Sequence, residues 1–310
     1  MLQTNSDSYS LPIYGIGPFN GKGIVQYLHL SNSMNIDSCV LDNYLSERFE
    51  EKFTYTLNGR EAINIALRSY DLDKSDLVTI LTTSQSFYIS GCVTKEIEKF
   101  CNWNRAIVPE TKIIFVNHEF GYIYPDMDYL VSLGLPIIED CCTTFFSQDA
   151  AGKVGKYGDF AVYSFPKFFP VQIGGMLVSN EGKTLNGIPS IEANTKIHLQ
   201  RVLGHCILML DELLYKRKTN FDYGLEQFSQ LGFSERFEKQ FLTVPSAMML
   251  KNNGIVKDLP ALKTALWNHG IESSVFYGED AFFIPSHQNL TKTDLNYFFE
   301  VLKSFIQKSP

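Results

Sequence analysis

The feature that most constrains the fold of this chain is a series of short, apolar, β-branched segments with helix-like stretches between several of them. The segments are 77–83, 112–117, 135–140, 160–165 and 175–180. Their length suits buried strands, and their spacing leaves room for helical crossovers. The pattern predicts βαβ units and an α/β fold with a mostly parallel central sheet flanked by helices.

In a parallel sheet of this kind, ligands bind outside the carboxyl ends of the strands. Asp140 ends one predicted strand, and Ser164 lies next to the end of another. We therefore expect a ligand site near these two residues. Each has an ordinary alternative, because Asp140 could simply cap a helix or join an ion pair, and Ser164 could be a plain strand end.

A helix is predicted at 58–70. Asn58 can cap it, Glu61 follows three residues later, and its apolar residues share one face. The free N–H groups of Gly59 and Arg60, at the positive end of the helix dipole, suit a phosphate. An ordinary capped helix is the alternative interpretation.

The last third of the chain has a different character. A long helix is predicted at 195–215, followed by a helix at 259–270, a strand at 271–277 and a final helix at 290–306. We therefore expect two domains. Residues 1–220 form a large α/β domain with an N-terminal arm, and residues 221–310 form a small C-terminal α+β domain.

Composition narrows the class of protein. The net charge of −7 gives no electrostatic footprint for nucleic acid, so an anionic ligand needs a local site. No apolar run approaches the roughly 20 residues that cross a bilayer, and no signal segment is visible at the start. The six cysteines are too sparse for a disulfide framework and have no metal-ligand spacing. These observations favour a reduced, cytoplasmic protein without nucleic-acid, membrane or metal partners.

Lys167 stands between aromatic residues in the segment YSFPKFFP. A lysine flanked by Phe165, Phe168 and Phe169 is hard to leave fully solvated. Desolvation lowers the pKa of an amine, as a lysine that forms a Schiff base requires. The alternative is a side chain that snorkels to the surface between the rings.

The order of these features resembles a known family. An aspartate, a Ser-Phe pair, a lysine and a Gly-Gly pair follow one another at Asp140, Ser164, Lys167 and 174–175. The chain resembles the DegT/DnrJ/StrS-type pyridoxal-phosphate sugar aminotransferases, which are fold-type-I aminotransferases. The similar segments are NGREAINIAL, TKIIFVNHEFGYIYPDMDYL, LPIIEDCCTT, VGKYGDFAVYSFPKFFPVQIGGMLVSN and IPSHQNLTKTDLNYFFEVL.

The resemblance implies roles for these residues. Lys167 would be catalytic, holding pyridoxal 5'-phosphate as a Schiff base and then moving the proton between substrate and cofactor. Asp140 would keep the pyridine nitrogen protonated. Ser164, Gly59 and Arg60 would hold the phosphate, the last two through their N–H groups, with the Arg60 guanidinium as a further contact.

Two further residues follow from the same resemblance. Tyr88 would stack on the cofactor ring, with Phe87 as the alternative. Asn220 matches an asparagine that reaches the phosphate of the partner subunit in the family. A homodimer is therefore implied.

The implied reaction moves an amino group from an amino acid, glutamate in the simplest case, to a nucleotide-linked keto sugar. Its setting would be surface-polysaccharide or deoxyamino-sugar biosynthesis. Two alternatives stay open. One is a pyridoxal-phosphate sugar dehydratase, although relatives that dehydrate carry histidine where this chain has Lys167. The other is a non-catalytic or cofactor-binding-only member.

The chain also departs from the family pattern. The stretch between Phe100 and Thr111 is shorter, which predicts the loss of a sheet strand or of its connection. Thr143 stands where a glutamine or histidine is expected, and Asp222 stands near the position of an arginine. The small domain is short as well, and these departures motivate the non-catalytic alternative.

Overall fold

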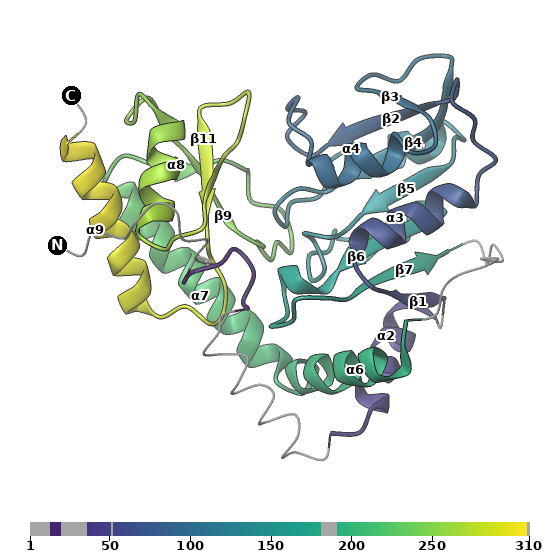
Figure 1. The fold of residues 1–310 in the computed structure, drawn as a ribbon, viewed down its shortest axis with the longest axis horizontal. Helices are drawn as coiled ribbons and strands as arrows, with labels where there is room; N and C mark the ends of the chain where they lie inside the picture. Colours follow the sequence, from purple (N-terminus) through teal and green to yellow (C-terminus); the bar gives the residue numbers. More distant parts are fainter. Residues whose placement is uncertain (1–12, 20–35, 51, 181–190, 309–310) are drawn as a thin grey trace.

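The computed structural model describes residues 13–19, 36–50, 52–180 and 191–308 and contains two β-sheets (Figure 1). The larger sheet has seven strands among these residues. In spatial order they are β1 (Phe53–Thr56), β7 (Gly175–Ser179), β6 (Phe160–Ser164), β5 (Ile137–Asp140), β4 (Thr111–Asn117), β2 (Leu77–Thr82) and β3 (Asn102–Asn104). The strands from β6 to β3 are parallel, whereas β7 is antiparallel to β6 and β1. The predicted α/β fold with a mostly parallel central sheet is confirmed.

Helices cover both faces of this sheet. One face packs against α3 (Gly59–Arg68) and α4 (Gly91–Ile97). The other packs against α2 (Cys39–Phe49), α5 (Met127–Ser132) and α6 (Ala193–Leu208). Alternation along the strands explains the two cores, because successive side chains point to opposite faces. The central strands β2, β4, β5 and β6 therefore carry apolar residues on both sides, as the apolar runs in the sequence require.

Helix α3 begins where the sequence predicts. The Asn58 side chain accepts a hydrogen bond from the N–H of Glu61 at 3.0 Å, and the Glu61 carboxylate accepts one from the N–H of Leu57 at 2.5 Å. This reciprocal capping fixes the first turn. Ala62, Ile63 and Ala66 are buried, so the apolar face of α3 lies on the sheet.

The sequence predicts the loss of a sheet strand or of its connection between Phe100 and Thr111. A strand is present here, β3, which pairs in parallel with the first half of β2. The connection that follows it is short, because residues 105–110 lead from β3 to β4 without a helix. Arg105 lies at the start of this short crossover and donates to the carbonyl of Ile80 at 2.6 Å.

The smaller sheet lies in the last third of the chain. Its strands, in spatial order, are β10 (Ser274–Val275), β11 (Ala281–Ile284), β9 (Met248–Lys251) and β8 (Ser234–Glu235), all antiparallel. A second core joins it to α7 (Leu210–Ser229), α8 (Leu259–Asn268) and α9 (Lys292–Lys308). The strand predicted at 271–277 is therefore reduced to two residues.

The single helix predicted at 195–215 is two helices, α6 and α7, which meet at Met209. Helix α7 links both cores. Leu213 packs in the core of the large sheet, and Phe221 and Phe228 pack in the core of the small one. The boundary expected between residues 220 and 221 thus falls inside one continuous helix.

The described part of the N-terminal arm, residues 13–19, does not lie with the large sheet alone. Tyr14 forms a bridge with Ile271, next to the small sheet. A side chain at Gly17 would come within 2.4 Å of the carbonyl oxygen of Pro166, so the arm also touches the lysine segment. In the described part of the chain, no helix is long and apolar enough to cross a membrane.

Candidate active site

The carboxyl ends of β5 and β6 bring Asp140 and Ser164 to the same face of the sheet. Asp140 lies opposite Val162 in the parallel pairing, and Ser164 follows Val162 by two residues. Residues two apart on a strand share a face. Val162 and Ile138 pack against α3, so Asp140 and Ser164 lie on the α3 side as well.

The N-terminus of α3 lies close to these residues at Gly59. A Cβ atom at Gly59 would lie 2.8 Å from Sγ of Cys142 and 3.4 Å from Cβ of Ser164. Only a residue without a side chain allows this approach. The structure therefore brings together the predicted residues Gly59, Ser164 and, through its neighbour Cys142, Asp140.

The first turn of α3 has the donors that a phosphate needs. Asn58 bonds the N–H of Glu61, which leaves the N–H groups of Gly59 and Arg60 without a hydrogen bond to any described residue. The Ser164 hydroxyl likewise has no partner in the described ranges. Together with the helix dipole, these free donors are of the kind that can hold an anion.

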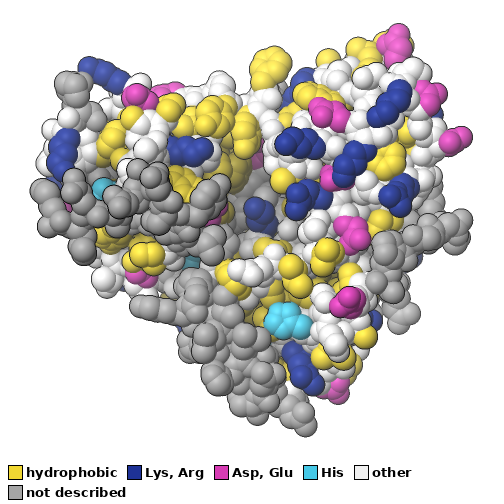
Figure 2. Space-filling view, viewed as in Figure 1, with side chains coloured by type: hydrophobic (Ala, Val, Ile, Leu, Met, Phe, Trp, Pro, Cys, Tyr) yellow, Lys and Arg dark blue, Asp and Glu magenta, His cyan; other side chains and the backbone are white. Residues whose placement is uncertain are grey.

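The first turn of α3 carries charges of both signs. Arg60 is exposed there, beside Glu61. Figure 2 shows Lys and Arg side chains, with Asp and Glu among them, over the part of this face that α3 and α4 occupy in Figure 1. The Arg60 guanidinium is therefore a cation next to the free N–H groups and can contact an anionic group.

Asp140 is a buried carboxylate with one free oxygen. Oδ1 accepts the N–H of Cys142 at 3.0 Å, and Oδ2 has no hydrogen bond to the described residues. Burial raises the pKa of Asp140, and the positive charge of Lys167 acts against this rise. A buried carboxylate gains most from a cationic N–H partner. A protonated pyridine nitrogen has that chemistry.

Lys167 ends a 3-10 helix, η1 (Phe165–Lys167), directly after β6. Phe165, Phe168 and Phe169 are fully buried, while Lys167 is exposed. The expectation that its aromatic neighbours desolvate the amine is therefore wrong. The tight turn directs the three rings into the core and leaves the lysine outside.

Lys167 nevertheless lies close enough to Asp140 and Cys142 for its charge to lower the pKa of both groups, against the larger effect of burial. The predicted lysine and aspartate thus share one site with Gly59 and Ser164. The residues present fit pyridoxal phosphate in their donors, charge and free positions.

Tyr88 packs against two aromatic residues that follow β10 of the small sheet, and no described contact joins it to Asp140, Ser164 or Lys167. Its ring centroid is 5.6 Å from that of Phe276 and 6.1 Å from that of Tyr277. Burial raises the pKa of its hydroxyl. The neighbouring Phe87 is 86% exposed. Stacking of Tyr88, or of Phe87, on a cofactor ring stays a prediction.

Asn220 is not brought to this site. Its amide nitrogen donates to the carbonyl oxygens of His287 at 3.0 Å and of Leu290 at 2.8 Å, and the residue is buried. Both amide hydrogens therefore hold a loop of the same chain. Contact with the phosphate of a partner subunit would require these bonds to open, and it stays a prediction. Asp222 pairs with Lys218 on the surface of α7.

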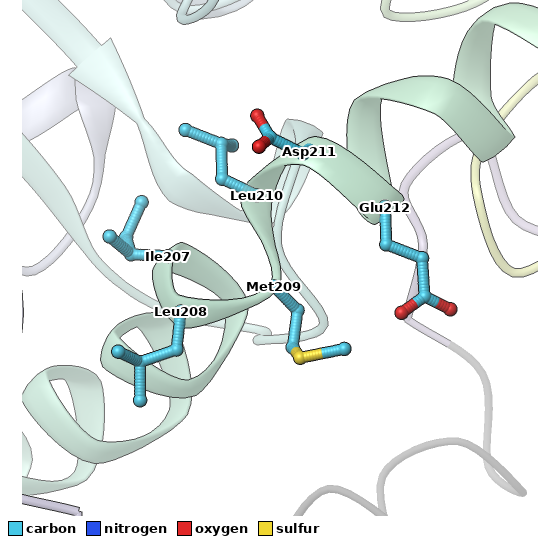
Figure 3. Close-up of a pocket in the computed structure, with 6 residues that line it drawn as sticks. All are labelled: Ile207, Leu208, Met209, Leu210, Asp211 and Glu212. Atoms are coloured by element: carbon cyan, nitrogen blue, oxygen red, sulfur yellow. The ribbon is translucent and has the colours of Figure 1, made fainter.

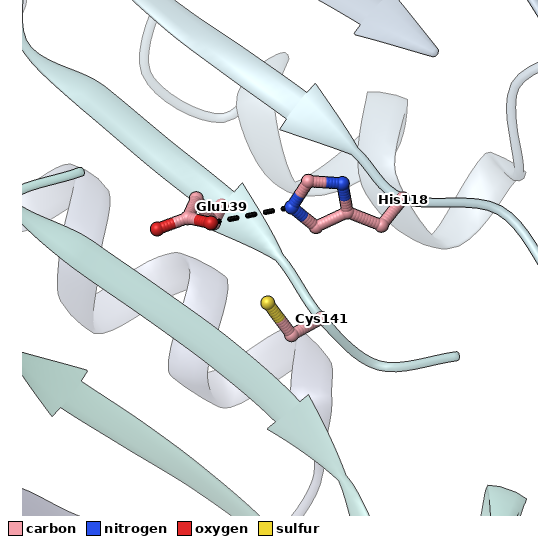
Figure 4. A group of neighbouring side chains, drawn as sticks. All are labelled: His118, Glu139 and Cys141. Atoms are coloured by element: carbon pink, nitrogen blue, oxygen red, sulfur yellow. Dashed lines mark hydrogen bonds and ion pairs between the residues drawn. The ribbon is translucent and has the colours of Figure 1, made fainter. Parts of the chain in front are cut away.

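A buried group behind Asp140 was not foreseen from the sequence. His118, Glu139 and Cys141 offer donor atoms within 4.8 Å of one another (Figure 4). His118 accepts the N–H of Tyr124 at Nδ1 and pairs through Nε2 with Glu139 at 3.2 Å. A ring that accepts at Nδ1 carries its proton at Nε2, so this nitrogen donates to Glu139.

Glu139 has further partners. Its oxygens accept the N–H groups of Gly155, Tyr157 and Gly158 at 2.7–3.0 Å. The ring nitrogens and carboxylate oxygens are thus already bonded, which favours a structural brace over a metal site. The sequence contained one signal for this group. Side chains alternate along β5, so Glu139 and Asp140 must point to opposite faces of the sheet.

Two surface hollows are lined by residues outside the candidate site. One, of about 380 Å³, is lined by residues 207–212 where α6 meets α7 (Figure 3). The other, of about 540 Å³, is lined mainly by residues 123–129 and 148–151. Neither contains a predicted site residue, and the donor arrangement around Asp140 therefore defines the candidate site.

Comparison with known proteins gives a consistent result. Residues 100–198 match the model of the DegT/DnrJ/EryC1/StrS aminotransferase family. This segment contains Asp140, Ser164 and Lys167. No curated protein matches the chain.

Several solved structures share the fold over nearly the full length. The aminotransferase TlmJ from Streptoalloteichus hindustanus is 15% identical, with 96% of this chain and 99% of that chain covered and a TM-score of 0.73. DesV from S. venezuelae is 15% identical, with coverages of 98% and 100% and a TM-score of 0.71. NtdA from Bacillus subtilis, solved with bound cofactor PMP, is 15% identical, with coverages of 99% and 87% and a TM-score of 0.68.

At this level of identity the structural likeness establishes the fold, and the family model adds a sequence match over the segment that carries the candidate site. The resemblance of this chain to the DegT/DnrJ/EryC1/StrS aminotransferase family is thereby confirmed.

Proposed function

We propose that this chain is a pyridoxal-phosphate-dependent aminotransferase that acts on a sugar. The observation that carries the proposal is the convergence of Lys167, Asp140, Ser164 and the N-terminus of α3 at one edge of the sheet. The match to the aminotransferase family and the PMP bound to NtdA support pyridoxal phosphate as the cofactor.

Each residue has a task that follows from its surroundings. The N–H groups of Gly59 and Arg60 and the Ser164 hydroxyl bind the phosphate. The free oxygen of Asp140 accepts a hydrogen bond from the protonated pyridine nitrogen. When bound, pyridoxal phosphate supplies an electron sink for charge at the carbon that exchanges the amine.

Lys167 is the catalytic residue of the proposal. Its amine would hold the cofactor through a covalent bond to the aldehyde carbon, and once the substrate amine replaced it there, the freed amine would take and return the proton at the reacting carbon. The exposed position of Lys167 leaves its amine accessible to a substrate. Burial raises the pKa of Asp140 because it costs the carboxylate its hydration, and a cation held beside the carboxylate would offset that cost.

We extend the proposal to the substrate and the assembly. The amino donor is an amino acid, glutamate in the simplest case, and the acceptor is a nucleotide-linked keto sugar of surface-polysaccharide or deoxyamino-sugar biosynthesis. The chain acts as a homodimer in the cytoplasm, with residues 1–220 and 221–310 as its two domains. The free state of the described cysteines is in keeping with a reducing compartment.

The test is a pair of half-reactions. Protein loaded with pyridoxal phosphate is mixed with glutamate, and the loss of the visible absorbance band and the formation of 2-oxoglutarate are followed. The product is then mixed with a panel of keto-sugar nucleotides, and the amino sugar is detected by mass spectrometry. Lys167→Ala is the control, in which neither half-reaction occurs.

The outcome separates the alternatives. Amino-acid-dependent formation of an amino sugar supports the aminotransferase. Loss of water from the sugar without transfer of nitrogen would identify a dehydratase. Protein that binds the cofactor, or fails to bind it, without either reaction would identify a non-catalytic member.

A further inference from the structure

Behind the lysine segment lies a buried arginine that no carboxylate of the described residues neutralises. Arg217, on α7, is fully buried. Its Nε donates to Oε1 of Gln288 at 3.1 Å and its Nη1 to the carbonyl of Pro245 at 2.9 Å, while Nη2 has no partner among the described residues. All these acceptors are neutral. Burial lowers the pKa of Arg217 to about 9.

An arginine in such surroundings is costly, because burying a cation without an anionic partner loses its hydration. The contacts of Arg217 indicate what its burial provides to the lysine segment. The guanidinium carbon lies 4.8 Å from the centre of the Phe168 ring, the residue directly after Lys167. Gln288, which accepts from Arg217, donates from Nε2 to the carbonyl oxygen of Phe168 at 3.0 Å.

These contacts form a closed loop around Phe168. Arg217 holds its ring and orients Gln288, and Gln288 holds its peptide carbonyl. All three residues are buried, so water does not compete for these bonds. From the protein interior they fix the backbone that bears Lys167, whereas the amine itself lies on the exposed side.

We propose that Arg217 and Gln288 are positioning residues that hold Lys167 in the orientation needed for its covalent bond to the cofactor. The proposal rests on the proposed function, since it concerns the bond between Lys167 and pyridoxal phosphate. It adds two residues from outside the phosphate and pyridine contacts. Neither touches the cofactor; both act through Phe168.

The test compares two ligands that differ only in this bond. Pyridoxal phosphate reacts with Lys167, whereas pyridoxamine phosphate carries an amine in place of the aldehyde and cannot. Affinities for both are measured by absorbance and fluorescence titration of the full-length protein. The variants are Arg217→Met, which removes the guanidinium, and Gln288→Glu, which still accepts from Arg217 but cannot donate to Phe168.

The expected result is a loss of about tenfold in affinity for pyridoxal phosphate in both variants, as for one lost buried hydrogen bond, with the affinity for pyridoxamine phosphate unchanged. Arg48→Met is the matched control. Arg48 also lies over a phenylalanine ring, at 4.8 Å from Phe49, and also has an Nη2 without a partner among the described residues, but it reaches Phe168 only through the ring of Phe145 and does not bond Gln288. It is expected to leave both affinities unchanged.

Equal losses for both ligands would show a merely structural role and overturn the proposal, as would no loss for either. If Arg217→Met does not fold, Gln288→Glu alone carries the comparison. Wild-type protein reports separately on the proposed function, because wild-type protein that binds neither ligand contradicts that function before any variant is considered.

Discussion

At the scale of single residues, Gly59 determines how closely α3 approaches the ends of β5 and β6. A side chain there meets Sγ of Cys142 at 2.8 Å, closer than real contacts of this kind. The first turn of α3 would have to move away from Ser164. The N–H groups that we assign to the phosphate would move with it.

We therefore expect Gly59→Ala to lower the affinity for pyridoxal phosphate at least tenfold, the effect of about 1.4 kcal/mol. The measurement is an absorbance titration. Cys142→Ala removes the atom that clashes, so the double variant Gly59→Ala/Cys142→Ala should recover most of the affinity. A double variant as weak as the single one would count against this steric explanation.

At Asp140, the stability of the cofactor-free protein and the binding of the cofactor make opposite demands. Burial raises its pKa above the ordinary value of 3.8, so the folded protein binds this proton more tightly than the unfolded chain. Stability is therefore lost as the pH rises from the ordinary value of the carboxyl through the raised one. This cost belongs to the ionised form of Asp140.

Asp140→Asn removes this cost and can still accept the N–H of Cys142 through its amide oxygen. We expect the free energy of unfolding of the cofactor-free variant to be about 1 kcal/mol higher than that of the wild type. We also expect the variant to bind pyridoxal phosphate much more weakly. Chemical denaturation with and without cofactor measures both effects. A variant that is less stable without cofactor would contradict the assignment.

The sequence predicted the residues that meet at this site better than it predicted their surroundings. Asp140 and Ser164 end adjacent strands, and strand ends can be read from hydrophobic runs. The exposure of Lys167 could not be read in this way. It depends on the direction of a 3-10 turn, which sends the neighbouring phenylalanines inward.

At the scale of elements, the crossover at 105–110 joins β3 to β4 in six residues without a helix. Arg105 stabilises this crossover at its start. Its guanidinium donates to the carbonyl of Ile80 at 2.6 Å, to the hydroxyl of Thr82 at 3.0 Å and to the carbonyl of Ser86. It thereby satisfies buried polar groups at and after the carboxyl end of β2 that would otherwise lack these donors.

We expect Arg105→Met to lower the free energy of unfolding by about 2 kcal/mol, because it leaves buried acceptors without donors. Urea denaturation followed by circular dichroism measures the change. Arg68→Met, which changes an exposed arginine in the last turn of α3, is the control and should have an effect below about 0.5 kcal/mol. Equal effects in the two variants would contradict the capping role of Arg105.

Elements were predictable to the extent that their own residues specify them. The apolar strands and α3 are specified by the hydrophobic pattern of their own residues, and all are present. The strand β3 has only three residues and owes its place to pairing with β2, so local pattern could not reveal it. The break between α6 and α7 at Met209 likewise has no glycine or proline to mark it.

At the scale of the whole molecule, His287 ties the N-terminal arm to the small sheet. Its Nδ1 accepts the N–H of Asn289, and its Nε2 donates to the carbonyl of Gly15 at 3.2 Å. Burial, together with the nearby charge of Arg217, lowers its pKa from 6.5 to about 3. The folded protein therefore keeps this ring neutral over a pH range in which the unfolded chain protonates it.

Stability from this group is present above pH 6.5 and is lost as the pH falls toward about 3. We expect the free energy of unfolding to fall by about 1.4 kcal/mol per pH unit in this range, and His287→Asn to remove that slope. Denaturation at pH 7, 6 and 5 measures it. The exposed His269, changed to Gln, is the control, and a slope unchanged in His287→Asn would contradict the assignment.

The central claim concerns Lys167, and the most direct measurement is chemical. Purified protein is incubated with pyridoxal phosphate, reduced with borohydride, digested and analysed by mass spectrometry. The account predicts a reduced cofactor adduct on the peptide that contains Lys167, and its absence in Lys167→Ala. An adduct on other lysines only, or none at all, would contradict it.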